Sequence, residues 1–271
     1  MIGTSTLLSG HEHIHMLNNY SFPTNKTTVF KYMPLGRFVE SVENKVLVFV
    51  SPEKWYDPFE QLYYGIDCSA NGYHTEDIAC MCVSEKSSTN EDASWRVYSE
   101  ANSKTVRISI EQDNLLQLLD DYATAQGYEV YIGKVNYSFE KQAIRNLHKV
   151  SSPHYNDYFP AIMKVEHYLS LMLLKRAAFK YENEVRIFLV KNSITEKLLK
   201  IPCDYKATGL VSNVTLSPYP PVRETSDLAY QVRERINKIE SEQIKSVLKN
   251  KVGCRIQQSQ LYKVCQRVRN V

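Results

Sequence analysis

The pattern in this chain that is most clearly suited to catalysis consists of two glutamates and an arginine at alternate positions. Glu182, Glu184 and Arg186 follow the aromatic residues Phe179 and Tyr181. Because alternate side chains of a strand point to the same face, a strand here would place all three charges together. Two neighbouring carboxylates repel, so one should keep its proton to higher pH, as acid–base catalysis requires. The alternative is the solvated outer face of an edge strand.

Two further segments combine aromatic with charged residues. Between Val48 and Glu60 an apolar run leads into a turn that carries prolines, aromatic rings and the acid Asp57. Between Trp95 and Tyr98 two rings flank an arginine, just ahead of an alternating segment. Large rings also serve simply to fill a core, so this alternative stands beside a role in binding.

The histidines and cysteines give weak signals for a metal. His11, His13 and His15 alternate, as zinc ligands on a strand can, but no cysteine or carboxylate framework surrounds them in the sequence and terminal segments are usually loose. The six cysteines match no common zinc spacing. Cys80 and Cys82 would share one face of a strand as small buried residues. We therefore predict no metal site.

The C-terminal part of the chain is strongly basic although the net charge is only +3. From Leu228 to Val271 the sequence holds ten Lys and Arg against three Glu. Such a segment attracts phosphates, as in nucleic acids. The alternative is a solvated helix face followed by a basic tail.

Short apolar segments and a few amphipathic ones must position these residues. With 43% hydrophobic and 23% charged residues the chain is of a globular type, and nine glycines against 19 tyrosines argue against a glycine-rich phosphate loop. No regular alternation of strands and helices is visible, which favours an α+β fold over a doubly wound parallel sheet. We expect strands at 29–33, 46–50, 78–83, 105–110, 129–135, 184–190, 209–216 and 254–264, and helices at 38–44, 114–125, 158–179 and 228–250.

The expected organisation is an N-terminal extension, residues 1–28, followed by a single α+β domain, residues 29–271. The longest apolar runs are far shorter than the roughly 20 residues that span a bilayer, and no secretory signal is visible. Free cysteines suit a reducing compartment. We therefore expect a cytoplasmic protein that does not contact a membrane.

The motifs, in this order, resemble those of a large uncharacterised bacterial family, a domain of unknown function. The resemblance covers about residues 29–265. It is carried by Phe30-Lys31-Tyr32, Ser51-Pro52 through Tyr56-Asp57-Pro58-Phe59-Glu60, Cys82-Val83-Ser84, Trp95 to Tyr98, and Phe179 to Arg186. The chain departs from the family at Tyr56, where Asn is usual, at Val83, where Phe is usual, and in lacking a glycine-rich stretch after Tyr98.

That family is in turn similar in layout to ADP-ribosyltransferases. The resemblance implies a split, mostly antiparallel sheet with flanking helices that clamps NAD. Lys31 or Tyr32 would contact NAD, Tyr98 would stack on nicotinamide, and Glu184 would be the catalytic glutamate with Glu182 as its partner. The predicted NAD site also includes Trp95, Arg186 and Asp57.

The expected function is therefore transfer of ADP-ribose from NAD to a macromolecule, with RNA or DNA favoured over protein because of the basic C-terminal part. Similar enzymes include toxins and phage-defence effectors, and a toxin would fit an antitoxin or chaperone partner, of which the sequence carries no mark. Two alternatives remain open. One is a metal-dependent nuclease or nucleotide hydrolase that uses Asp57, Glu60, Glu182 and Glu184. The other is a non-catalytic nucleic-acid-binding protein.

Overall fold

The computed structural model describes most of the chain. The described residues are 3–23, 27–55, 60, 77–85, 94–95, 104–139, 164–192, 197–218, 227–259 and 261. Contacts divide the chain into two compact units. Unit 1 consists of residues 1–27, 47–86 and 115–201, and unit 2 consists of residues 28–46, 87–114 and 202–271. The predicted extension at 1–28 therefore supplies residues to unit 1.

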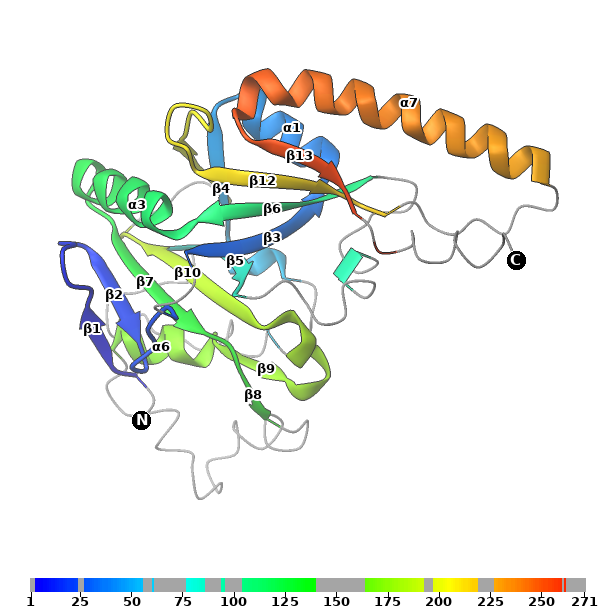
Figure 1. The fold of residues 1–271 in the computed structure, drawn as a ribbon. Helices are drawn as coiled ribbons and strands as arrows, with labels where there is room; N and C mark the ends of the chain where they lie inside the picture. The colour runs from blue at the N-terminus through cyan, green and yellow to red at the C-terminus, as the bar shows by residue number, and fades with distance from the viewer. Residues whose placement is uncertain are drawn as a thin grey trace. The chain divides into compact units, whose positions relative to one another are not determined.

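Unit 1 is built on a mostly antiparallel sheet. Its strands lie in the order β1 (Ser5–Leu7), β2 (Ile14–Leu17), β7 (Glu129–Lys134), β10 (Glu184–Val190) and β5 (Ile78–Ser84). Only the β2–β7 pair among these is parallel. Strand β4 (Val46–Val50) pairs with β5 and with β11 (Leu198–Pro202). Strands β8 (Asn136–Phe139) and β9 (Leu174–Arg176) form a separate parallel pair. Figure 1 shows the course of these strands within the unit.

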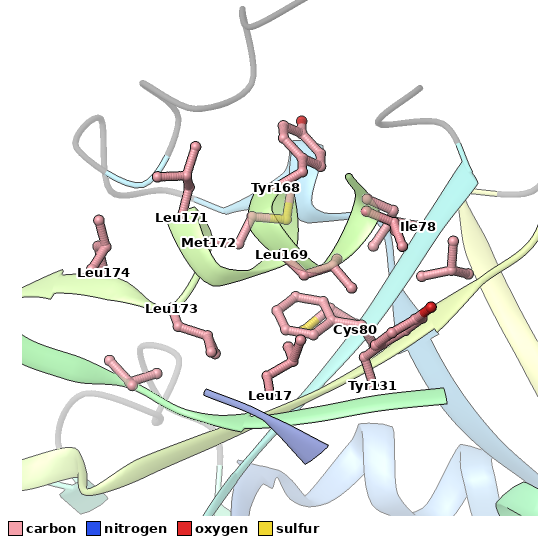
Figure 2. Packing of buried hydrophobic residues seen from close by; sticks show 14 residues of the cluster. Leu17, Ile78, Cys80, Tyr131, Tyr168, Leu169, Leu171, Met172, Leu173 and Leu174 are labelled. Carbon is pink, nitrogen blue, oxygen red and sulfur yellow. The ribbon is translucent and has the colours of Figure 1, made fainter. Parts of the chain in front are cut away.

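Among the described residues, two α-helices belong largely to unit 1. Helix α3 (Gln112–Gln126) buries the leucines that predicted it and ends at Gly127, whose positive φ of 69° is accessible to glycine without strain. Helix α6 (Val165–Leu171) covers one face of the sheet. Its side chains pack with Leu17, Ile78, Cys80 and Tyr131 from the strands below (Figure 2).

The predicted core helix at 158–179 is confirmed only over α6 (Val165–Leu171) and is wrong over the described residues that follow it. After the short α6 the chain passes into β9 and then into the 3-10 helix η5 (Ala177–Glu182). The run is apolar because Val165, Tyr168, Leu169 and the residues from Leu171 to Leu174 are buried in the core of unit 1, and burial alone does not require a helix. The residues before Lys164 lie outside the described part of the chain.

The described strands of unit 2 also pair mostly antiparallel. Strands β3 (Thr28–Pro34), β6 (Thr105–Glu111), β12 (Val211–Leu216) and β13 (Arg255–Gln258) follow one another in space, and only the last pair is parallel. Helix α1 (Leu35–Glu43) begins directly after Pro34 and contacts the long helix α7 (Asp227–Val252). Figure 1 shows α7 ending close to the start of β13. Strand β13 is shorter than the predicted strand at 254–264.

The α+β class with mostly antiparallel pairing is thus confirmed. Strands β3, β5, β6, β7, β10 and β12 and helices α1, α3 and α7 lie within a few residues of their predicted positions. Within the described residues, no helix is both long and apolar enough to cross a membrane.

Candidate functional site

Strand β10 carries the Glu-x-Glu-x-Arg pattern in the interior of unit 1. All seven of its residues are buried, because β5 and β7 pair with it on either side. The alternative of a solvated edge strand is therefore wrong. Glu182 lies outside the strand, at the end of η5, and Asn183 turns the chain with a positive φ of 45°. The predicted common strand face holds only Glu184 and Arg186, and the turn brings Glu182 to them.

Among the described residues, five charged side chains meet at the start of β10, and we call them the charge cluster. Three are carboxylates and two are cations, and none is more than 9% exposed. The members are Glu60, Lys175, Glu182, Glu184 and Arg186.

Lys175 is shared among the three carboxylates of the charge cluster. Its Nζ lies 2.6 Å from Glu182, 3.0 Å from Glu184 and 3.4 Å from Glu60. The ring of Phe179 lies 5.0 Å from the same ammonium group, within cation–π range. Because Lys175 sits in β9, the parallel pairing of β9 with β8 helps to fix its backbone.

Arg186 is held by protein groups through all three of its side-chain nitrogens. Its Nε and Nη2 donate hydrogen bonds to the carboxylate of Glu184 at 3.0 and 3.2 Å, and Nη2 also donates to Glu60 at 2.5 Å. Nη1 donates to the carbonyl of Met172. The ring of Trp55 lies over the guanidinium at 4.1 Å. Arg186 therefore fixes Glu184 in one orientation.

A glycine makes room beside Arg186. Gly133 of β7 is directly opposite Arg186 in the register. A Cβ built at Gly133 would lie only 2.4 Å from Cδ1 of Leu173 and 3.1 Å from Cβ of Leu17. The close approach of these two leucines thus requires glycine at this position.

The backbone on either side of Asn183 is fixed by two hydroxyl groups. Ser84 donates from Oγ to the carbonyl of Glu182 at 2.7 Å. The N–H of Glu184 donates to the hydroxyl of Tyr137 at 2.8 Å. Both glutamates are therefore held by their backbone as well as by the cations.

The two glutamates of the pattern have very different proton affinities. Burial raises the pKa of Glu182 to about 7; the Lys175 ammonium opposes this rise and the Glu184 carboxylate adds to it. Burial would raise the pKa of Glu184 too, but Arg186 and Lys175 hold it well below its usual value. Near neutral pH, Glu184 is an anion while Glu182 can take up or release a proton.

This proton sets the charge of the whole cluster. With all five groups ionised the three carboxylates exceed the two cations by one negative charge. A proton on Glu182 makes the cluster neutral. Burial lowers the pKa of Lys175, yet the neighbouring Glu184 and Glu60 carboxylates outweigh it and leave that pKa above its usual value, so Lys175 stays charged.

Three of the other predicted site residues, Lys31, Tyr32 and Trp95, belong to unit 2. Lys31 and Tyr32 lie on β3 of unit 2, and Tyr32 packs edge-on against the buried Trp95 with ring centroids 5.0 Å apart. The charge cluster belongs to unit 1. Tyr98 and Asp57 lie outside the described residues. Their proposed contacts with NAD stay predictions.

Sequence reasoning missed Lys175 and gave Glu60 only a metal-binding role. Lys175 fell inside the wrongly predicted helix. The available signal was the Lys175-Arg176 pair, which interrupts a long apolar run. Glu60 ends the Ser-Pro to Phe-Glu motif, but its position beside Arg186 depends on a contact between residues far apart in the chain.

The N-terminal histidines contact carboxylates in unit 1. His11 lies 3.2 Å from Asp120 of α3, and His13 and His15 lie 3.3 and 2.8 Å from the two oxygens of Glu129. Within the part of the chain that the structure describes, no group of three or more His, Cys, Asp or Glu side chains has an arrangement that could hold a metal ion.

Comparison with known proteins gives one match. The model of a family described as a protein of unknown function (DUF2971) matches residues 94–187, which include β10 as far as Ile187 together with Lys175, Glu182 and Glu184. This is less than half of the chain, and the predicted resemblance extended from 29 to 265. No curated protein and no solved structure matches the chain.

Proposed function

We propose that this protein is an NAD-dependent ADP-ribosyltransferase whose reaction centre is the charge cluster. The observation that carries the proposal is the unequal carboxylate pair. Glu184 is a fixed anion held by Arg186, and Glu182 is a neighbouring carboxyl with a pKa of about 7. Cleavage of a glycosidic bond uses such a division of roles, with one carboxylate facing the sugar and another group moving a proton.

The reaction breaks the bond between nicotinamide and C1′ of the ribose. The bonding electrons leave with nicotinamide, which becomes neutral, and positive charge develops on the ribose. The anionic Glu184 stabilises this charge. An oxygen or nitrogen of the acceptor then bonds to C1′ and gives its proton to the ionised Glu182. NAD is a substrate here, and no metal takes part.

The charge of the cluster suits one end of NAD. With Glu182 ionised the cluster carries one excess negative charge, which attracts the cationic nicotinamide–ribose end. Lys175 and Arg186 are positioning residues, since their polar atoms already contact the glutamates. This role replaces the direct contact with NAD that the sequence predicted for Arg186. The diphosphate needs other cations, and Lys31 remains the proposed one, with Tyr32, Trp95, Tyr98 and Asp57 as proposed NAD contacts.

Three finer parts of the proposal follow from the resemblance in the sequence. The fold is of the ADP-ribosyltransferase type, which the mostly antiparallel pairing of the strands supports. The acceptor is RNA or DNA, which the basic helix α7 supports. The biological role is that of a toxin or phage-defence effector acting in the cytoplasm, with an antitoxin or chaperone as its partner.

The test is transfer of label from NAD carrying a labelled adenylate phosphate. Wild-type protein is incubated with RNA, DNA or a cell lysate, with and without EDTA. We expect label on a macromolecule in both conditions, because the proposed transfer needs no metal. A metal-dependent hydrolase would instead stop working in EDTA. Glu184→Gln should abolish labelling, whereas the surface variant Glu43→Gln should label as the wild type does. Equal labelling by wild type and Glu184→Gln, or no labelling of any acceptor, would overturn the proposal.

A further inference from the structure

Helix α7 presents a row of basic side chains on one face. Arg235, Lys238, Lys245 and Lys249 recur at intervals of three, seven and four residues, which is the spacing of one helix face. Arg255 of β13 extends the row, and we call these five residues the basic stripe. Four of them are exposed and Lys245 is partly exposed.

The face next to the basic stripe is already used for packing. Ser241, Leu248 and Val252 of α7 are buried in unit 2. Burial of this face fixes the rotation of the helix about its axis. The basic stripe is therefore held at the surface by the same packing, and binding would not require the helix to be ordered first.

A groove lies at the C-terminal end of the basic stripe. It has a volume of about 510 Å³, and Lys245, Lys249 and Arg255 line it together with Ile256. Glu242, which also lines it, lies 2.8 Å from Lys245. Since the three cations outnumber this single carboxylate, the groove attracts anions.

We propose that the basic stripe and its groove bind the phosphate backbone of a single-stranded nucleic acid. From Arg235 to Lys249 the stripe extends about 21 Å along the helix at a rise of about 1.5 Å per residue. A ligand that uses this whole length must repeat its negative charge, as a polynucleotide does and a single phosphate does not. Positively charged grooves that follow the backbone are typical of single-strand binding.

An anionic membrane suits this helix less well. Membrane-surface helices insert an apolar face, and the apolar face of α7 at Leu248 and Val252 is packed within unit 2. The exposed large hydrophobic residues of α7 among those described are Ile239 and Val247.

This binding surface deepens the proposed function, because it names how a nucleic-acid acceptor is held. Only the role of the nucleic acid as acceptor rests on the proposed function; the binding itself does not.

The test measures binding in the absence of NAD, so its failure is distinct from failure of transfer. Fluorescence anisotropy follows a labelled oligouridylate and a labelled oligothymidylate over a range of salt concentrations. The triple variant Lys245→Ala/Lys249→Ala/Arg255→Ala should bind roughly ten- to a hundredfold more weakly near physiological salt. Its salt slope, log Kd against log salt, should fall by about 2, at about 0.7 for each lost phosphate contact. The two probes separate RNA from DNA.

The matched control is Lys54→Ala/Lys164→Ala/Lys200→Ala, which removes the same charge from exposed positions in unit 1. We expect this variant to keep most of the affinity. An equal loss in both triple variants would show a non-specific charge effect and overturn the proposal. So would wild-type protein that binds neither probe, or that binds phosphatidylserine vesicles in their place.

Discussion

The charge cluster of unit 1 and the basic stripe of unit 2 use the same residue types in opposite surroundings. In the charge cluster Arg186 is 1% exposed and Glu184 is 4% exposed, and each charge faces an opposite one at 2.5–3.4 Å. In the basic stripe, Lys245 pairs with Glu242, and these side chains are 29% and 63% exposed.

Burial decides what each group of charges does. In the interior a charge cannot be solvated by water, so its partners hold it strongly and shift its pKa. At the surface, water and salt screen each pair, which leaves the cations available to a ligand. In the two proposals made above, the interior group therefore acts on a bound molecule, and the surface group attracts one.

We expect the largest loss of stability when Arg186 is removed. Arg186→Leu leaves three carboxylates with Lys175 alone, and we expect the free energy of unfolding to fall by about 3–5 kcal/mol. Urea denaturation measures this change. A loss below about 1 kcal/mol is typical of a surface ion pair. It would contradict the expectation that the buried ion pairs of Arg186 stabilise the protein strongly.

The next effect concerns Glu182 and pH. Its pKa of about 7 in the folded protein exceeds the ordinary value of 4.5. Its contribution to stability is therefore complete below about pH 4.5 and is lost as pH rises through 7. Relative to Glu182→Gln, which resembles the protonated form, wild type should lose on the order of 1–3 kcal/mol between pH 5 and pH 8.

Thermal denaturation of both proteins across this pH range checks that prediction. The control is Glu43→Gln, whose side chain is half exposed. Parallel pH curves for wild type and Glu182→Gln would show that Glu182 titrates normally.

A third prediction tests the space beside Arg186. Gly133→Ala brings a methyl group into contact with Leu173 and Leu17, so we expect a loss of about 1–3 kcal/mol through overpacking. Gly36→Ala in α1 is the matched control, because no atom lies within 4 Å of its added Cβ. It should leave stability nearly unchanged. Equal melting temperatures for the two variants would refute the packing argument.

The smallest effect is expected at the surface of unit 2. Lys251→Ala removes the partner of Glu43, and the exposed pair should contribute no more than about 1 kcal/mol. Denaturant titrations at low and high salt measure it. A loss as large as that of Arg186→Leu would erase the difference between the two regions.

Local patterns in the sequence were enough to place much of the fold. Strand β10 has the predicted boundaries, and α3 ends at the predicted Gly127. These elements have a clear period or a clear terminator, which act over a few residues. The run around Leu169 misled because its helical spacing of apolar residues continues past the end of α6 at Leu171 into residues that are buried without being helical.

The candidate site could be predicted only in part, because local patterns reveal only those members that are close together in the sequence. Glu184 and Arg186 are two residues apart, so their common face follows from strand geometry. Glu60 and Lys175 reach them through contacts over 126 and 9 residues of sequence. The chain turn at Asn183 that moves Glu182 off the strand is a local left-handed conformation, which asparagine adopts more readily than most residues.

In the proposed function, Glu184 and Glu182 divide the chemistry between a fixed anion and a proton acceptor. The most direct measurement is the pH–rate profile of nicotinamide release from NAD by wild type, Glu182→Gln and Glu184→Gln, each checked for folding by circular dichroism. We predict a wild-type rate that rises through pH 7, a slower and pH-independent rate for Glu182→Gln, and no release by Glu184→Gln. Absence of release by wild type at every pH, or one profile shared by all three proteins, would contradict the account.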